Sequence, residues 1–365
     1  MTPTLDLSLP VADLTAALID IASVSGDETP LADAVEAALA ALPHLSVVRD
    51  GDAILARTSL GRSERVVLAG HLDTVPLPRT PGSRGTVPSS WDGDVLYGRG
   101  TTDMKGGVAV QLKLAASLVE PTKDVTYVFY DHEEVEASLS GLGRLARNHT
   151  ELLTDAVFAI LLEPTNGGVE GGCNGTMRFR VTTTGKAAHS ARAWMGSNAI
   201  HAAAPILGRL AEHSPETVDV EGLAFRESLN AVRISGGVAG NVIPDHCEVE
   251  VNYRFAPSRS VEQAEAYVRS LLEGFSVVRT DAAAGARPGL DRQVAAEFVA
   301  VAGPGGGQAE VMPKYGWTDV ARFSELGVPA VNFGPGDALL AHSDNEHVTR
   351  QAIDECLAAL TRWLS

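Results

Sequence analysis

The stretch from Val66 to Asp73 reads VVLAGHLD, a short apolar run that ends directly before a histidine and an aspartate. Val66–Ala69 predicts a buried strand, because strands covered on both faces read as continuous runs of Val, Ile and Leu. Two similar runs, Val125–Tyr130 and Ala156–Leu162, also end beside acidic side chains. In an open α/β sheet, ligands bind in the crevice at the carboxyl ends of the strands. The pattern therefore predicts that residues far apart in the sequence converge on one site.

The composition describes a large acidic protein. The chain has 365 residues, 45% of them hydrophobic, so we expect two domains with substantial cores. The net charge of −17 argues against nucleic acid or an anionic membrane as a partner. Three scattered cysteines favour a reducing compartment. The first residues lack the basic and apolar regions of a signal peptide, and no run approaches the roughly 20 apolar residues that span a bilayer. We expect a soluble, cytoplasmic protein.

The chain is organised as one domain interrupted by another. Strand-like and helix-like patterns alternate in its first part, as in an α/β fold with a mainly parallel sheet and helices on both faces. After Gly171–Gly175 the order becomes strand, helix, two strands, helix, strand, which is the ferredoxin-like α+β arrangement. The expected domains are a catalytic domain of residues 1–175 and 286–365, and an insert of residues 176–285.

Two capping patterns mark helices of the insert. Asn198 precedes the helical pattern Ala199–Glu212 and is a residue type that caps helices. Ser260 and Gln263 have the spacing of a capping box before Val261–Leu272.

The predicted catalytic domain carries the side chains of a two-metal hydrolase. Imidazole and carboxylate ligands without cysteine suit zinc, and also cobalt. Two such ions about 3.5–4 Å apart activate a water and stabilise the developing oxyanion of an amide. We therefore predict two divalent metal ions, zinc in first place and cobalt in second. The candidate residues are His71, Asp103, Glu133, Glu134, Glu163 and His342.

Each candidate also has a simpler local interpretation. Asp103 lies between a glycine-rich turn and a helical pattern, where an aspartate often caps the helix. Glu133 and Glu134 belong to an acidic loop, which is usually solvated, and a single loop histidine such as His342 is more often structural. The metal interpretation depends on the joint occurrence of the whole set.

The motifs around these residues closely resemble the dinuclear zinc aminoacylase/carboxypeptidase family of metallopeptidases. The resemblance covers nearly the whole chain and includes the insert. The matching motifs are Gly70–Pro76, Tyr97–Gly107, Glu133-Glu134, Glu163-Pro164, His342, Gly185–Ser190 and Gly240–Asp245.

The resemblance implies a role for each predicted metal ligand. Asp103 is similar to a carboxylate that bridges both metals, and the peptide bond after it is often cis in this family. His71 and Glu163 would complete one metal site. Glu134 and His342 would complete the other.

The resemblance also implies the residues of catalysis. Glu133 would be the general base, and Asp73 would orient His71. The insert resembles the family's dimerisation domain, which implies a homodimer. His189 is similar to a histidine that reaches the partner's active site, and Asn241 to its companion, although Asn241 is equally typical of a turn.

Three segments are most similar to one branch of the family, namely Arg192–Gly196, Tyr315–Phe323 and Asn332–Asp337. That branch removes succinate from N-succinyl-LL-2,6-diaminopimelate in lysine and diaminopimelate biosynthesis, so it implies a small N-acyl amino acid substrate. Arg254 matches a carboxylate-binding arginine, a task that suits the guanidinium fork, although a solvent-facing strand position is the alternative. Thr318 resembles a substrate-contacting threonine.

Other functions remain open at this stage. Cys173 and Asn174 occupy a stretch where more familiar enzymes of this branch carry basic residues. Within the family, the alternatives are an acetylornithine deacetylase or a dipeptidase. From another class, the alternative is a non-catalytic metal- or peptide-binding protein, against which Glu133 argues because binding alone needs no base.

Overall fold

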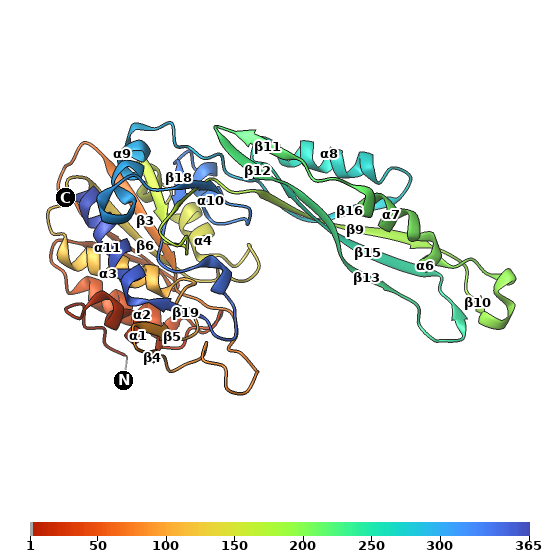
Figure 1. The fold of residues 1–365 in the computed structure, drawn as a ribbon, viewed down its shortest axis with the longest axis horizontal. Helices are drawn as coiled ribbons and strands as arrows, with labels where there is room; N and C mark the ends of the chain where they lie inside the picture. The colour runs from red at the N-terminus through yellow and green to blue at the C-terminus, as the bar shows by residue number, and fades with distance from the viewer. Residues whose placement is uncertain (1–2) are drawn as a thin grey trace. The chain divides into compact units, whose positions relative to one another are not determined.

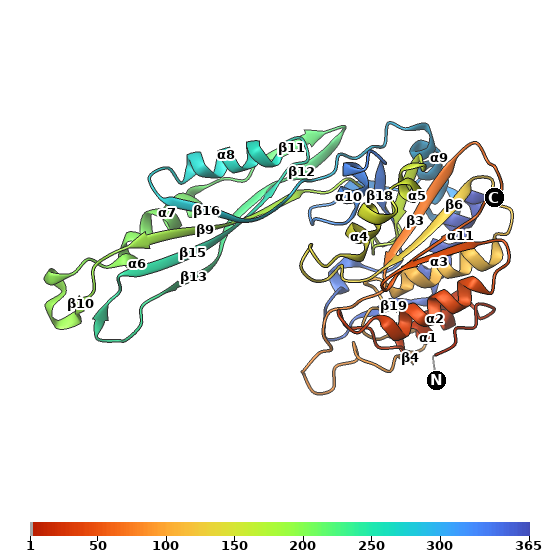
Figure 2. The same cartoon turned by 180° about the vertical axis from the view of Figure 1, so that it is seen from behind.

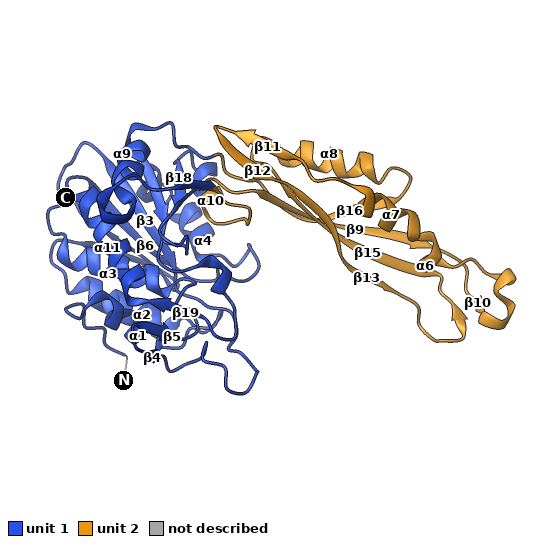
Figure 3. Ribbon diagram, viewed as in Figure 1, with its two compact units in different colours: residues 1–171, 288–312, 322–365 blue, residues 172–287, 313–321 orange. Residues whose placement is uncertain are grey.

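The computed structural model describes residues 3–365 and divides into two compact units (Figure 3). Unit 1 contains the described residues up to Gly171, together with Pro288–Met312 and Arg322–Ser365. Unit 2 contains Gly172–Arg287 and Pro313–Ala321. The last segment is one that the sequence analysis assigns to the second part of the catalytic domain. Thus Thr318 groups with the insert, and the functional division into domains stays a prediction.

Unit 1 is built on a mixed, mainly parallel sheet of eight strands. The four central strands β6, β3, β7 and β18 are parallel to one another, whereas β2 pairs antiparallel with β6, and the edge strand β1 pairs antiparallel with β2. The order is β1 (Ser46–Asp50), β2 (Ala53–Arg57), β6 (Asp124–Tyr130), β3 (Arg65–His71), β7 (Phe158–Leu161), β18 (Ala330–Asn332), β8 (Val169–Gly171) and β17 (Val311–Pro313).

Helices cover both faces of this sheet, as the sequence predicts. Val66 and Leu68 of β3 belong to the core that contains helices α1, α3, α9 and α11. Val67 and Ala69 alternate with them, so they point to the opposite face, and they are buried as well. Figures 1 and 2 show α3 and α11 on one side of β3 and β6, and α4 on the other. These helices are α1 (Val11–Ile19), α3 (Lys105–Ser117), α4 (Gly141–Asn148), α9 (Gln293–Ala302) and α11 (Arg350–Leu364).

The other elements include a small sheet and several helices, of which α10 has its first two residues in unit 2. A three-stranded sheet has the order β19 (His347–Thr349), β5 (Val95–Tyr97) and β4 (Ser90–Asp92). The other helices are α2 (Thr29–Ala40), α5 (Glu151–Thr154), α10 (Val320–Glu325) and the 3-10 helices η2 (Pro304–Gly306) and η3 (Ala338–Leu340).

Unit 2 has the predicted ferredoxin-like arrangement. Its four-stranded antiparallel sheet has the order β13 (Ser228–Gly236), β15 (His246–Phe255), β9 (Gly175–Thr184) and β16 (Ser276–Ala283). One face packs against α6 (Ala199–Ala202), α7 (Ala204–Glu212) and α8 (Val261–Leu271) through a separate core. The capping box of Ser260 and Gln263 is confirmed.

Two features of unit 2 differ from the expectation. Asn198 does cap a helix, but the single helix Ala199–Glu212 is divided at Ala203. Pro205 accounts for the break, because proline has no N–H to continue the helical hydrogen bonds. The sequence analysis also misses a hairpin of β11 (Thr217–Val220) and β12 (Leu223–Arg226). Unit 2 further contains β10 (Ala188–His189), β14 (Val242–Ile243) and the 3-10 helix η1 (Ser190–Met195).

Among residues 3–365, none of the helices combines the length and the apolar character needed to cross a bilayer.

Candidate metal centre

The predicted ligands of unit 1 meet at the carboxyl ends of its parallel strands. His71 is the last residue of β3, and Glu163 lies two residues after β7. Glu133 and Glu134 lie in the turn that follows β6. The loop after β18 supplies His342, which has the left-handed φ of 62°. This arrangement follows from the parallel pairing of β6, β3 and β7, which brings the ends of these strands to one edge.

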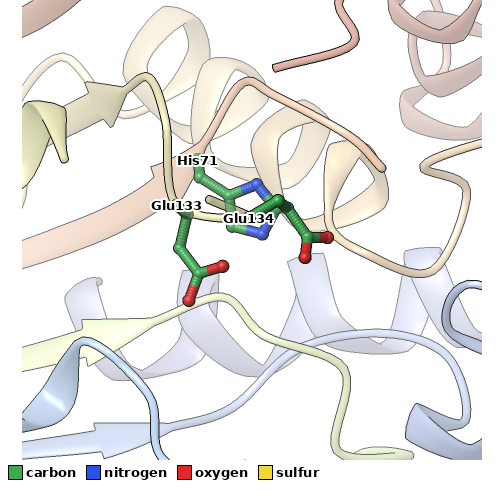
Figure 4. Close-up of side chains that lie close together, drawn as sticks. All are labelled: His71, Glu133 and Glu134. Carbon is green, nitrogen blue, oxygen red and sulfur yellow. The ribbon is translucent and has the colours of Figure 1, made fainter. Parts of the chain in front are cut away.

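Three overlapping groups of side chains have ligand atoms within 4.8 Å of one another. Together they contain all five predicted ligands and Glu133. Figure 4 shows His71 with Glu133 and Glu134, whose carboxylates point in different directions although the residues are adjacent. The groups are His71 with Asp103 and Glu163, Asp103 with Glu134 and His342, and His71 with Glu133 and Glu134.

Asp103 connects two of these groups. Its Oδ1 lies 3.1 Å from Nε2 of His71, and its Oδ2 lies 3.3 Å from Nε2 of His342. Oε1 of Glu134 lies 2.9 Å from the same His342 nitrogen. Asp103 does not cap α3, whose N-cap is Met104 without a side-chain hydrogen bond. The Asp103–Met104 peptide bond is cis.

Asp73 contacts both the histidine and the glutamates. Nδ1 of His71 lies 3.0 Å from the backbone carbonyl of Asp73 and 3.5 Å from its carboxylate. The carboxylate accepts the backbone N–H groups of Glu133 and Glu134, each at 3.0 Å, and the hydroxyl of Ser25 at 2.7 Å. Burial raises the pKa of Asp73, but these hydrogen bonds and the nearby imidazole outweigh burial and lower it to about 2. Asp73 is therefore an anion whose carboxylate accepts two N–H groups of the turn after β6 and lies near His71.

A second buried carboxylate at the centre, Glu346, is not predicted from the sequence. Its Oε1 accepts the backbone N–H groups of Thr102 and Asp103, both at 3.1 Å, and its Oε2 lies 2.6 Å from Arg99. Glu346 and Arg99 are both buried. The residues around Glu346 do not distinguish it from an ordinary exposed acid of a loop. Its position four residues after the predicted ligand His342 is the one feature of the sequence that could have suggested a role at the centre.

The electrostatics of the centre favour a cation. Hydrogen bonds to Asp103 and Glu134 raise the pKa of His342 to about 10. Burial opposes protonation of His71, but the carboxylates of Asp103 and Asp73 outweigh it and raise its pKa well above the usual value. The histidines in turn hold the pKa of Asp103 far below its usual range, against the effect of burial. Clustered carboxylates of this kind are costly without compensating positive charge, and the imidazole and carboxylate donors present fit zinc-type ions.

The remaining predicted residues lie in unit 2, at two ends of its sheet. β10 pairs with β14, and the backbone N–H of Ser190 donates to the carbonyl of Asn241 at 2.9 Å, so His189 and Asn241 are close. Arg254 pairs with Thr176 near the start of β9. His189 comes after Thr184, the last residue of β9, and so lies beyond the other end of this strand. With about 3.3 Å per residue, these ends are roughly 25 Å apart.

Thr318 and Arg254 belong to the same region of unit 2. The Thr318 carbonyl accepts a hydrogen bond from the Cys173 thiol at 3.8 Å, just before β9 begins. Nε of Arg254 donates to Oδ1 of Asn252 at 3.2 Å. Burial, followed by the nearby Arg178 cation, lowers the pKa of Arg254. The structure therefore does not bring Arg254 together with His189 and Asn241 within one chain.

Residues 67–365 match Peptidase family M20/M25/M40. The chain belongs to this family. Two curated relatives of this M20 protein are similar over its full length. A putative succinyl-diaminopimelate desuccinylase of Mycobacterium tuberculosis is 51% identical over 363 residues, which cover 99% of each chain. A succinyl-diaminopimelate desuccinylase of Corynebacterium glutamicum is 42% identical over 375 residues, covering 100% of this chain and 99% of the relative.

Solved structures support the fold of this M20 protein. The metallo-carboxypeptidase Sso-CP2 of Sulfolobus solfataricus has a TM-score of 0.78 at 16% identity, covering 97% of this chain and 98% of the other. Aminopeptidase PepT of Bacillus cereus has a TM-score of 0.77 at 18% identity, covering 99% and 98%. A dinuclear metal-binding peptidase of Bacillus subtilis has a TM-score of 0.72 at 16% identity, covering 97% and 96%.

Proposed function

We propose that this M20 family member is a metal-dependent amide hydrolase that removes succinate from N-succinyl-LL-2,6-diaminopimelate. The observation that carries the substrate assignment is the full-length identity of 51% and 42% to two succinyl-diaminopimelate desuccinylases. The cluster of histidines and carboxylates at the strand ends supports the reaction class, because two-metal centres of this donor type hydrolyse amides. The reaction would supply diaminopimelate for lysine and cell-wall precursor synthesis.

The proposed centre holds two divalent metal ions. His71 and Glu163 would bind one, Glu134 and His342 would bind the other, and Asp103 would bind both. When bound, such ions lower the pKa of a water and polarise the scissile carbonyl. Zinc is the first choice and cobalt the second, since both accept imidazole and carboxylate ligands.

Glu133 is proposed as the general base. Its backbone is fixed by Asp73 at 3.0 Å, and its carboxylate points away from that of Glu134. An acid that is not a metal ligand can take a proton from the attacking water and return it to the nitrogen of the leaving amine. Asp73 is proposed to position both His71 and this glutamate.

Arg254 and Thr318 are proposed to bind the substrate, with Arg254 recognising a carboxylate. Arg254 is half-buried, and among residues 3–365 no carboxylate forms a salt bridge with its guanidinium. A substrate carboxylate could therefore supply the missing negative charge. A guanidinium binds a carboxylate through two parallel hydrogen bonds, which suits a substrate with several carboxyl groups.

We further propose a homodimer in which His189 and Asn241 act on the partner's substrate. Within one chain, their end of the unit 2 sheet is roughly 25 Å from Arg254, at about 3.3 Å per residue. His189 and Asn241 are therefore too far from Arg254 to contact the same small substrate, and we propose that they contact the substrate of the partner. The edge strand β13 also exposes Val232 and Ile234, which are 58% and 47% exposed. An apolar edge strand is a site where a second chain can pair. A cytoplasmic location is proposed because the three cysteines are all free thiols.

Substrate competition tests this function. The purified protein is assayed with N-succinyl-LL-2,6-diaminopimelate and, in parallel, with N-acetylornithine. Preferential release of succinate is the expected result. Hydrolysis of the acetyl compound alone would keep the chemistry and overturn the substrate.

A further inference from the structure

The turn that carries Glu133 and Glu134 is held by two buried carboxylates. Three successive backbone N–H groups donate to them. His132 donates to Oε1 of Glu28 at 3.2 Å, while Glu133 and Glu134 donate to the two oxygens of Asp73. Glu28 and Asp73 are both fully buried. The turn follows the end of β6 and precedes the exposed residues 135–139.

His132 is the residue at which the turn changes direction. Its φ is 57°, in the left-handed region that side chains other than glycine rarely adopt. Such a conformation persists only where surrounding contacts determine it. The contact on its backbone N–H is the Glu28 carboxylate, so Glu28 acts at the point that sets the directions of the next two residues.

The side chain of His132 adds a second connection to Glu28. Its Nδ1 lies 2.8 Å from Oδ2 of Asp131 and 3.3 Å from Oε1 of Glu28. Asp131 is in turn 2.6 Å from the guanidinium of Arg144 on α4. Helices α2 and α4 are thereby connected to the turn through charged and hydrogen-bonding groups rather than through apolar packing alone.

Glu28 is itself fixed in place. It directly precedes α2, and its Oε2 accepts the backbone N–H of Gly26 at 2.7 Å. The preceding segment is attached to the metal-ligand loop, because the Ser23 hydroxyl donates to the Leu72 carbonyl at 2.7 Å and Ser25 donates to Asp73. A residue held this firmly can transmit its position to the turn.

We propose that Glu28 is a positioning residue of the hydrolase, which holds the His132 turn so that Glu133 faces the reacting water while Glu134 faces the metal. This inference rests on the proposed function of Glu133 and Glu134. Glu28 belongs to none of the three ligand groups and accepts backbone N–H groups instead, so its loss would act through the direction of two other side chains. Small misplacements of this kind reduce the rate of the chemical step more than they reduce substrate binding.

The test compares Glu28→Gln with Asp124→Asn. Gly26 and His132 donate to different oxygens of Glu28, and a glutamine would replace one of these oxygens by an NH₂ group that cannot accept. Asp124 is the matched control, because it is also a buried carboxylate that accepts backbone N–H groups, from Leu60 at 2.8 Å and Arg62 at 2.9 Å. It lies at the start of β6, whereas the turn follows the end of that strand.

For Glu28→Gln we expect a fall in kcat of at least about 10-fold, the lower limit typical of residues that orient metal ligands. KM is expected to stay within about twofold and the metal content at the wild-type level. The visible absorption of the cobalt-loaded protein should change, because it reports the arrangement of the ligands. Asp124→Asn should lower the melting temperature and leave kcat and the cobalt spectrum unchanged.

Wild-type kcat and cobalt spectrum in a folded Glu28→Gln variant would overturn the proposal, as would equal effects of the two variants. If Glu28→Gln fails to fold, Glu28→Asp replaces it in the test, because aspartate keeps the charge and withdraws the carboxylate from His132 by one methylene. A lower kcat and a changed cobalt spectrum would then support the proposal, and wild-type values of both would overturn it. If the wild-type protein hydrolyses no succinyl substrate, the proposed function fails, and the cobalt spectrum still decides the role of Glu28.

Discussion

Oδ1 of Asp103 lies 3.1 Å from Nε2 of His71, while its other oxygen faces His342 at 3.3 Å. The two histidines come from the end of β3 and from a loop late in the chain, so a single carboxylate connects distant parts of unit 1. This arrangement supports the proposed bridging role of Asp103, because each of its oxygens faces a different predicted histidine ligand. Asp103 is therefore the residue on which both proposed metal sites depend.

Asp103→Asn is expected to release metal. An amide supplies one acceptor oxygen without charge, so the variant should bind fewer than two equivalents and lose more activity than the 10–100-fold typical of outer-shell changes. Metal analysis after dialysis measures the first effect and steady-state assays the second. Two tightly bound metals in this variant would show that Asp103 does not bridge.

Glu133→Gln is expected to separate catalysis from metal binding. The variant should keep two metals and lose about 10²–10⁴-fold in kcat, the range that general bases contribute. Glu136→Gln is the control, since Glu136 is an exposed acid of the same loop. If the two variants have equal activity, Glu133 is not the base, and the non-catalytic alternative gains support.

Arg254→Lys is expected to raise KM for the succinyl substrate about 10–100-fold with a smaller effect on kcat, because lysine keeps the charge and loses the bidentate fork. Arg180→Lys is the control on the adjacent strand, where Arg180 pairs with Glu248 at 3.0 Å. An unchanged KM for Arg254→Lys would support the alternative that Arg254 is a solvent-facing strand residue.

Mixed dimers test whether His189 serves the partner's site. Chains with His189→Ala and chains with Glu133→Gln should each be inactive alone. After co-expression, heterodimers would contain one intact site, so about a quarter of wild-type activity should return if subunits pair at random. Activity no greater than the sum of the two variants, or a monomer in analytical ultracentrifugation, would argue against the dimer.

Asp124→Asn also gives a prediction for pH. Burial raises the pKa of Asp124, but its hydrogen bonds outweigh burial and hold the pKa below the usual 3.8. Because the folded state has the lower pKa, the ionised carboxylate stabilises the fold above pH 3.8, and this contribution is lost as the pH falls through the lower, folded-state value. The variant should be less stable by about 1.5–3 kcal/mol at pH 7 and approach the wild type in acid. Urea unfolding of the wild type and the variant, at pH 7 and at a pH below 3.8, measures the difference in their free energies of unfolding.

The sequence predicts the parts of the site that follow regular strands. His71, Glu133 and Glu163 come after continuous apolar runs that identify β3, β6 and β7, so their convergence follows from the parallel sheet. Glu28 and Glu346 could not be predicted this way. Each is a loop acid whose burial depends on contacts with residues far along the chain.

The hairpin that was not predicted in unit 2 has a similar origin. The hairpin of β11 and β12 has only four residues in each strand, which is too short to give a clear period. The grouping of residues 313–321 with unit 2 depends on tertiary hydrogen bonds, such as that from Trp317 to the Ala284 carbonyl at 3.1 Å.

Titration of the metal-free protein with zinc tests whether hydrolysis of the succinyl substrate requires two metal ions per chain. The protein is stripped with a chelator, and hydrolysis of N-succinyl-LL-2,6-diaminopimelate is followed as zinc is added back. We expect no activity without metal, and we expect the rate of hydrolysis to reach its maximum when two zinc ions are bound per chain. Full activity in the stripped protein, or no hydrolysis with two ions bound, would contradict it.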